Sequence, residues 1–185
     1  MHSMNKKTSV IWEFLKIIII SLIIVVPVRY FLFQPFVVRG QSMEPNFHNG
    51  DYLIIDELSY RLRDPQRGEI VVFRSPVGQT TYYIKRIIGL PGETVRIKDG
   101  KVIIYTIQGK EIDLNELNYL PSSSKTSGNL EVSLGYDQYF VLGDNRSASY
   151  DSRRFGPISR KDIIGRVYFR AWPLDLSAKI EVPSY

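Results

Sequence analysis

Residues 69–88 read EIVVFRSPVGQTTYYIKRII. Within this stretch, two runs rich in β-branched and aromatic residues, 69–73 and 80–88, lie on either side of a short segment with a proline and a glycine. Runs of this composition that end at turn residues are typical of β-strands. The stretch therefore predicts two strands, and it sets the expectation for the rest of the chain.

Short β-branched and aromatic runs of the same kind continue in both directions from this stretch. We expect further strands at 52–55, 94–97, 101–107, 138–142 and 165–170. Asp99-Gly100 between two of them is a hairpin signal, and no strong helical periodicity follows Phe36. The sequence therefore predicts a mainly β fold, with antiparallel coiled sheets or a partly closed barrel.

Residues 108–136 differ from the predicted strands because they are polar and weakly patterned. The clearest example is the stretch at 121–128, which reads PSSSKTSG. We expect this part of the chain to form a variable surface loop or a small cap inserted into the sheet.

The N-terminal part of the chain is dominated by apolar residues from 11 to 33. As a helix this run would be roughly 35 Å long, which exceeds the roughly 30 Å of a hydrocarbon core. Lys6 and Lys7 precede it, so the positive-inside rule keeps the N-terminus in the cytosol. A cleavable signal peptide is the alternative, but no small-x-small cleavage pattern follows Val28. The sequence thus predicts a single-pass protein of the plasma membrane, with a cytoplasmic tail at 1–10, a transmembrane anchor at 11–33 and an extracytoplasmic β-domain at 34–185.

The composition of the 185 residues narrows the possible chemistry. Lysine and arginine outnumber aspartate and glutamate 24 to 19, a formal net charge of +5, but the basic residues are spread along the chain. We therefore expect no nucleic-acid partner, since binding would need a concentrated basic stripe or a known motif. There is no cysteine, which excludes thiol nucleophiles, disulfides and cysteine-ligated zinc. With only His2 and His48 and no H-E-x-x-H motif, we expect no metal and no cofactor.

Ser42 and Lys85 are the candidate reacting residues. Ser42 follows Gly40, which lets the backbone approach a substrate closely, and Pro45 fixes the chain soon afterwards. A serine hydroxyl needs a neighbouring base, and a buried lysine can be that base because burial lowers its pKa from about 10.4. Taken singly, such a serine more often caps a turn and such a lysine more often lies at a sheet surface. The catalytic interpretation requires the two side chains to meet.

A third motif, LGDNRSASYDSR at 142–153, follows these two. In this order, and behind a predicted anchor, the three motifs resemble those of the type I signal peptidases, also called leader peptidases, in their single-span Gram-positive form. The resemblance extends from the anchor to about 172–173. It implies a signal-peptidase β fold and a membrane-anchored serine endopeptidase that removes signal peptides from exported preproteins after small-x-small (Ala-x-Ala) sites. Its partners would be those preproteins and the lipid bilayer, and the oligomeric state stays open.

The resemblance also implies roles for individual residues. Ser42 would attack the scissile carbonyl, Lys85 would act as general base, and the Ser42 backbone N–H would hold the oxyanion. Gly40 stands where some relatives carry a serine that donates to the oxyanion. Supporting roles would fall to Ser149, which orients the lysine, and to two ion pairs, Arg86 with Asp144 and Asp151 with Arg153. Substrate contacts would come from Phe36, Val38, Gly40, Gln41, Met43, Val72, Tyr83 and Ile84, whose alternative role is ordinary core packing.

Three other interpretations stay open from the sequence. A self-cleaving Ser-Lys repressor-type protein shares such a β-rich core, but it would need a DNA-binding or partner module and no anchor. A membrane-tethered chaperone or assembly factor of the same fold would bind signal sequences without cutting them; such relatives lack the serine or the lysine, and both are present here. A generic anchored β-domain leaves the three ordered motifs unexplained. Ser147-Ala148 departs from the Asp-Asn of many relatives, which we expect to change loop polarity rather than chemistry.

Overall fold

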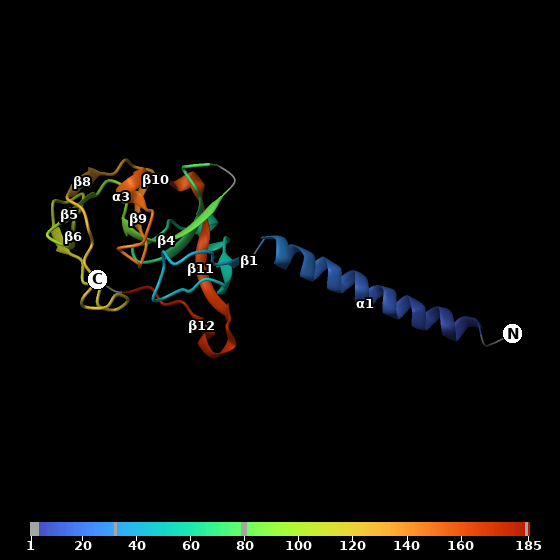
Figure 1. The fold of residues 1–185 in the computed structure, drawn as a ribbon. Coiled ribbons are helices and arrows are strands. Elements are labelled where there is room, and N and C mark those ends of the chain that lie inside the picture. The colour runs from blue at the N-terminus through green and yellow to red at the C-terminus, as the bar shows by residue number, and fades with distance from the viewer. Residues whose placement is uncertain (1–3, 32, 79–80, 184) are drawn as a thin grey trace.

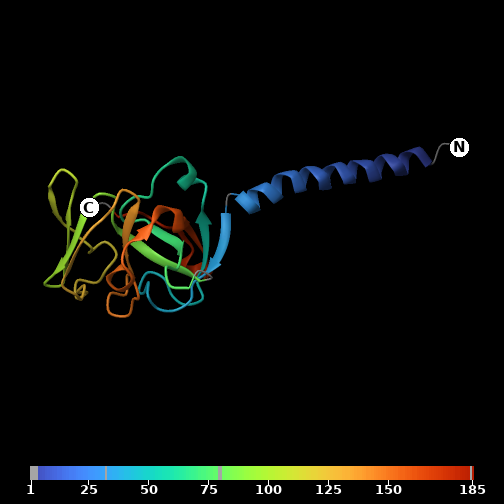
Figure 2. The same ribbon diagram turned by 90° about the horizontal axis from the view of Figure 1, so that it is seen from above.

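The computed structural model describes residues 4–31, 33–78, 81–183 and 185. Helix α1 (Met4–Phe31) extends away from a body of β-strands, and the C-terminus lies on the opposite side of that body (Figures 1 and 2). The helix ends before the predicted limit of 33, because Phe33 already belongs to a strand that pairs with the sheet. Among the described residues, no helix is long and apolar enough to cross a membrane. The anchor at 11–33 therefore stays a prediction.

The larger sheet contains eight antiparallel strands in the order β1-β2-β11-β3-β4-β9-β10, and β12 pairs with β11 beside this path. Its strands are β1 (Phe33–Val37), β2 (Tyr52–Asp56), β3 (Ile70–Arg74), β4 (Tyr82–Gly89), β9 (Gln138–Leu142), β10 (Ile158–Ser159), β11 (Ile163–Trp172) and β12 (Ala178–Lys179). Short helical turns connect them: α2 (Ser59–Leu62), α3 (Ser152–Phe155), η1 (Arg160–Asp162) and η2 (Leu174–Leu176). The strands predicted at 69–73 and 80–88 are thus β3 and β4, and they are neighbours.

The smaller sheet has four antiparallel strands in the order β7-β6-β5-β8 and lies at the end of the body away from α1 (Figure 1). Its strands are β5 (Thr94–Lys98), β6 (Lys101–Tyr105), β7 (Glu111–Asp113) and β8 (Leu130–Ser133). Asp99 and Gly100 form the predicted hairpin turn, both with positive φ. Within the described residues both sheets are open, which confirms the antiparallel sheets and leaves no closed barrel.

The segment 108–136, for which the sequence predicted a variable surface loop or a small cap, also contains strands β7 and β8. Ile112 of β7 and Val132 of β8 pack against a core formed largely between the two sheets, around Ile97, Ile104 and Phe140. Each strand is so short that it turns only one or two side chains inward. An alternation of this length cannot be told from a polar loop by periodicity.

Strand β3 is buried on both faces, which explains its unbroken apolar run. Val71 packs with Phe73 and Ile87 on one face, while Val72 packs with Met43 and Leu53 on the other. The neighbouring strand β4 passes from exposed Tyr82 into the interior, and every residue from Lys85 to Gly89 is buried. The chain therefore carries Lys85 to the point where β4 enters the core.

Candidate active site

Ser42 lies on the turn that joins β1 to β2, and this turn is fixed from both ends. Val38 N donates to Asp51 O over 2.9 Å, and Gly40 N donates to Asn49 Oδ1 over 3.0 Å. Gly40 has a φ of 88°, a conformation that favours glycine. Beneath the turn, Met43 is only 1% exposed and packs in the core. The serine therefore stands on a rigid support rather than on a mobile loop.

Lys85 meets Ser42 inside the protein. Its side chain comes from β4, opposite Val71 of β3, and the residue is 4% exposed. Nζ lies 2.7 Å from Ser42 Oγ, and Nζ also donates to Ile84 O over 2.8 Å. Burial lowers the pKa of Lys85 to about 8, although the negative charges of Asp151 and Asp144 oppose that shift. With this pKa, roughly a tenth of Lys85 is neutral at pH 7, far more than for a lysine in water.

The loop 143–151 holds the backbone of Ser42 from the other side. Asn145 N donates to Ser42 O over 3.0 Å, and Asn145 Nδ2 donates to Gln41 O over 3.1 Å. A Cβ on Gly143 would lie 2.4 Å from Ser42 O and 2.2 Å from Ser149 Oγ, so only glycine fits there. The sequence analysis assigned no role to Gly143 or Asn145, although both stand in the third motif. Only the fold shows that this motif contacts the backbone of Ser42.

Ser149 is buried beside the site but does not contact Lys85 by a hydrogen bond. Among the described residues, the bonding partners of Lys85 Nζ are Ser42 Oγ and Ile84 O. Ser149 Oγ is buried without a hydrogen bond of normal geometry, although it lies near enough to Asp151 to help lower the pKa of that carboxyl. The orienting role expected for Ser149 stays a prediction.

Both expected ion pairs are present at the site. Asp151 accepts hydrogen bonds from Arg153 Nε and Nη2, each over 2.8 Å, and from Gly143 N over 3.1 Å. Burial raises the pKa of the Asp151 carboxyl, but the hydrogen bonds and charge of Arg153 outweigh it and hold the pKa below its usual value. This carboxylate is therefore charged near neutral pH and fixes the loop through Gly143.

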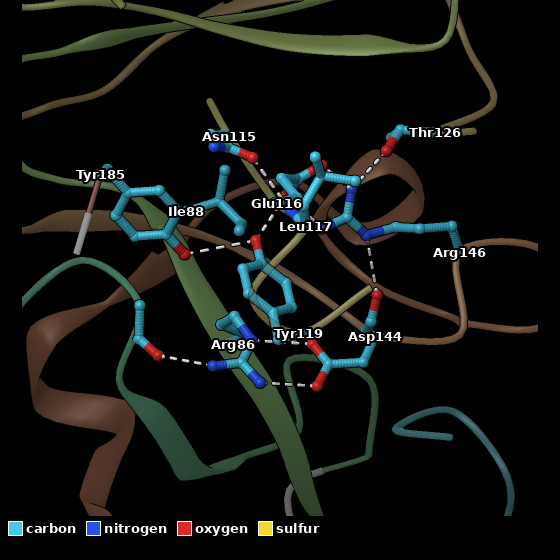
Figure 3. Close-up of polar contacts among 12 residues, drawn as sticks. Arg86, Ile88, Asn115, Glu116, Leu117, Tyr119, Thr126, Asp144, Arg146 and Tyr185 are labelled. Carbon is cyan, nitrogen blue, oxygen red and sulfur yellow. Dashed lines mark hydrogen bonds and ion pairs between the residues drawn. The ribbon is translucent and has the colours of Figure 1, made fainter. Parts of the chain in front are cut away.

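The second pair, Arg86 with Asp144, is almost fully buried (Figure 3). Arg86 Nε and Nη2 donate to the two carboxylate oxygens of Asp144 over 2.8 and 2.7 Å. Asn46 Nδ2 donates to the same carboxylate over 2.8 Å, and Arg86 Nη1 donates to Gly68 O over 2.9 Å. The pair thus joins β4, which carries Lys85, to the turn that carries Ser42 and to the third motif.

A cleft of about 670 Å³ opens beside Ser42 and Lys85. Seven of the eight predicted substrate-contact residues line it: Phe36, Val38, Gly40, Gln41, Val72, Tyr83 and Ile84. Met43 does not line the cleft, because its side chain packs in the core below the turn. Its contact with the substrate stays a prediction. The sequence analysis missed further lining residues: Val37, Arg39, Leu53, Thr81, Tyr82, Ala148 and Tyr150.

The missed lining residues come from places where the sequence gives no sign of a cleft. Leu53 is an ordinary inward residue of β2, and its pattern is that of core packing. Tyr82 packs edge-on against Phe36, with ring centroids 5.7 Å apart, and this contact joins β4 to β1 across the cleft. Ala148 and Tyr150 reach the cleft through the course of the 143–151 loop, which local sequence does not determine.

Comparisons with known proteins identify the family of the chain. Residues 11–172 match the model of the family described as "Signal peptidase, peptidase S26". A protein of Synechocystis named probable signal peptidase I-2 is 40% identical over 164 residues, which covers 86% of this chain and 72% of that protein. Signal peptidase I P of Bacillus subtilis subsp. natto is 37% identical over 181 residues, covering 92% of this chain and 94% of the relative.

A crystal structure of a signal peptidase I from Enterococcus faecalis V583 superposes with a TM-score of 0.47 at 30% identity, covering 57% of this chain and 97% of that one. The membership itself rests on the family model, which spans most of the chain, and on relatives aligned over nearly their full length. The chain therefore belongs to the signal peptidase family, peptidase S26, and is a serine peptidase.

Proposed function

We propose that this serine peptidase is a membrane-anchored signal peptidase I that removes signal peptides from exported preproteins with a Ser42–Lys85 dyad. The observation that carries the proposal is the 2.7 Å separation of Lys85 Nζ and Ser42 Oγ, made by a lysine that is 4% exposed. A surface lysine would keep its proton at neutral pH and could not accept one from serine. Burial supplies the neutral amine that general-base catalysis needs.

The reaction follows from this pair. With Lys85 neutral, the Ser42 hydroxyl donates its proton to Nζ while Oγ attacks the scissile carbonyl carbon. The Lys85 ammonium then gives that proton to the leaving amine, and the carbon–nitrogen bond breaks to leave an ester on Ser42. Lys85, neutral again, takes a proton from water while the water oxygen attacks the ester carbonyl. The Lys85 ammonium then returns that proton to Ser42 Oγ as the carbon–oxygen bond breaks and the acyl product leaves as its acid. Lys85 thus carries one proton in each half of the cycle.

The oxyanion formed in each half needs hydrogen-bond donors. The backbone N–H of Ser42 donates to no group in the described part of the chain, so it is available to the oxyanion. Gly40 offers no side-chain donor, and its own N–H is engaged by Asn49 Oδ1. We assign one donor to Ser42 N and leave the second to water.

The shape of the cleft supports cleavage after small side chains. Apolar residues from strands β1, β2, β3 and β4, among them Phe36, Val72 and Ile84, line the cleft that opens beside Ser42. An alanine side chain in the substrate could pack against these walls, whereas a larger one would have to displace them. Small-x-small sites such as Ala-x-Ala are the expected substrates.

Membrane anchoring is the remaining part of the proposal. Large apolar side chains of α1 are exposed along its described part, including Ile11 at 60%, Ile17 at 60% and Ile23 at 65%. Exposed apolar surface of this kind marks a contact with another protein or with lipid. We assign it to the bilayer, with the N-terminus in the cytosol and the catalytic domain outside.

The proposal is tested by cleavage of a preprotein with an Ala-x-Ala site, in detergent or lipid, by wild-type protein and by Lys85→Ala. We expect the wild type alone to cut after the second alanine, with circular dichroism showing that the variant is folded. A folded Lys85→Ala protein with normal turnover would contradict the dyad. If neither protein cuts but both bind the preprotein, the chaperone interpretation replaces this one.

A further inference from the structure

Residues 114–126, which we call the cap segment, contact all three segments that build the candidate active site. The segment follows β7 and was expected to be a variable loop, yet several of its side chains are buried, including Tyr119 at 8% and Thr126 at 2% exposed. None of its residues lines the substrate cleft. Any effect of the cap segment on catalysis must therefore be indirect, without contact with a substrate bound in the cleft.

The first contact runs through Arg146, which is 4% exposed (Figure 3). Its guanidinium donates to Glu116 Oε2 over 2.7 Å and to the Thr126 hydroxyl, both from the cap segment. Its Nε donates to Gly143 O over 3.1 Å. Gly143 is the residue whose Cα lies against Ser42 O, so the chain of contacts leads from the cap segment to the backbone of the nucleophile.

The second contact runs through Tyr119. Its ring lies 4.0 Å from the Arg86 guanidinium carbon, and Arg86 is the neighbour of Lys85 on β4. The Tyr119 hydroxyl donates to Glu116 Oε1 over 2.6 Å, which joins this contact to the first. Tyr185 donates to the same hydroxyl over 3.2 Å, so Tyr119 is held between Arg86 and the C-terminal segment (Figure 3).

The third contact runs through Asn46, on the turn that carries Ser42. Asn46 Nδ2 donates to Tyr119 O over 2.8 Å and to Asp144 Oδ2 over 2.8 Å. One amide thus joins the nucleophile turn, the cap segment and the third motif. Asn46 is half-buried, and both hydrogen bonds of its amide nitrogen are used in this junction, which favours one arrangement of the three segments.

We propose that Glu116 and Tyr119 are positioning residues, which hold Ser42 and Lys85 at reacting distance from outside the substrate cleft. The inference rests on the function proposed above, since it concerns the rate of that reaction. Glu116 acts through Arg146 on Gly143 and so on Ser42, while Tyr119 acts through Arg86 on the Lys85 strand. A small displacement of either reacting group is enough to lower the rate about 10- to 100-fold.

A positioning role differs from a purely structural one in its kinetics. Because the cap segment does not line the cleft, its loss should lower kcat per folded molecule and leave KM nearly unchanged. A purely structural role would lower the amount of folded protein and leave the kcat of what remains unaltered. Thermal melting and circular dichroism separate the two by giving the folded fraction at the assay temperature.

The test compares Glu116→Gln and Tyr119→Leu with two controls, on a peptide with an Ala-x-Ala site. Glu116→Gln removes the charge that holds Arg146, and Tyr119→Leu removes the ring that covers Arg86. Tyr119→Phe keeps that ring, and Asp113→Asn breaks an exposed ion pair with Lys101 close to the cap segment. We expect kcat to fall about 10-fold or more in the first two, and to stay within about 3-fold of wild type in the controls.

The outcomes are distinct. Normal kcat in folded Glu116→Gln and folded Tyr119→Leu overturns the inference, and so does a raised KM with kcat unchanged. A kcat for Tyr119→Phe as low as that of Tyr119→Leu also overturns it for Tyr119, since the ring would then be irrelevant. If Glu116→Gln does not fold, the two Tyr119 variants decide. Failure of the wild type to cleave at all contradicts the proposed function instead.

Discussion

Arg86 and Asp144 pair inside the larger sheet with side chains 3% and 0% exposed, whereas Lys101 and Asp113 pair on the smaller sheet with 65% and 53% exposed. In both ion pairs the cation lies on a strand, β4 for Arg86 and β6 for Lys101. The two pairs differ in the groups that surround them. The buried pair is also bonded to Asn46 and Gly68, while the exposed pair has water as its alternative partner. The buried ion pair therefore holds segments of the larger sheet in place, whereas the exposed ion pair lies on the surface of the smaller sheet.

The same contrast holds for lysine. Lys85 of the larger sheet is buried and its pKa is lowered to about 8 by that burial, whereas hydrogen bonding to Asp113 raises the pKa of exposed Lys101. Burying a lysine opposes folding, because the charged form loses its hydration. The larger sheet therefore contains a buried lysine that lowers the stability of the fold. A residue that costs stability is expected where activity requires it.

The largest difference between the sheets is expected in stability. Asp144→Asn leaves the buried Arg86 guanidinium without its counter-charge and should lower the free energy of unfolding by about 3 kcal/mol or more. Asp113→Asn removes only an exposed partner and should change it by less than about 1 kcal/mol. Urea unfolding followed by circular dichroism measures both. Equal effects would show that burial does not separate the two pairs.

A similar magnitude, with the opposite sign, is expected for Lys85→Met. The folded state releases the Lys85 proton near pH 8, but the unfolded chain holds it to 10.5, so the burial penalty is fully present below about pH 8. This shift corresponds to about 3 kcal/mol. At pH 7 the variant should be more stable than the wild type by up to that amount.

The pH dependence of that difference supplies the control. As pH rises from about 8 to 10.5, the unfolded wild-type chain also loses its proton, and the stability advantage of Lys85→Met should shrink. Lys101→Met on the smaller sheet should show no such advantage, because its exposed lysine is paired rather than buried. Unfolding curves at several pH values check both; a constant advantage across this range would contradict the lowered pKa.

The next comparison concerns the space around two glycines, and the substitutions Gly143→Ala and Gly109→Ala test it. The added Cβ at Gly143 would lie 2.4 Å from Ser42 O, whereas at Gly109, between β6 and β7, nothing lies within 4 Å. We expect Gly143→Ala to lower kcat/KM about 100-fold by displacing the nucleophile. Gly109→Ala should lose only about 1 kcal/mol of stability, from its positive φ. Cleavage of an Ala-x-Ala peptide by the two folded variants measures the difference, and equal rates would contradict the role of Gly143.

The sequence predicted the larger sheet better than the smaller one for a physical reason. Strands buried on both faces, such as β3, carry long apolar runs. In contrast, β7 turns only Ile112 inward and β8 only Leu130 and Val132, so both resemble loops in the sequence. Ser42 and Lys85 could be proposed as the reacting pair from the sequence, because serine and lysine in ordered motifs are recognisable residue by residue. Gly143 and Glu116 were not, because their roles depend on which distant segments the fold brings together.

The smallest effect is expected for Asp151→Asn, which should shift the pH dependence of the cleavage rate. The charge of Asp151 raises the pKa of Lys85 against the effect of burial, so removing it should lower that pKa further below 8. If the neutral amine is the base, as proposed, the rising limb of kcat/KM against pH should then move to lower pH.

The matched change on the smaller sheet is Glu131→Gln, which removes a carboxylate paired with exposed Arg96. Its charge is screened by solvent and does not act on Lys85, so the limb should stay where it is in the wild type. A limb that moves to higher pH in Asp151→Asn, or moves equally in both variants, would contradict the electrostatic account. A shift confined to Asp151→Asn would mean that the buried carboxylate of the larger sheet sets the working pH range of the lysine, while the surface charges of the smaller sheet do not.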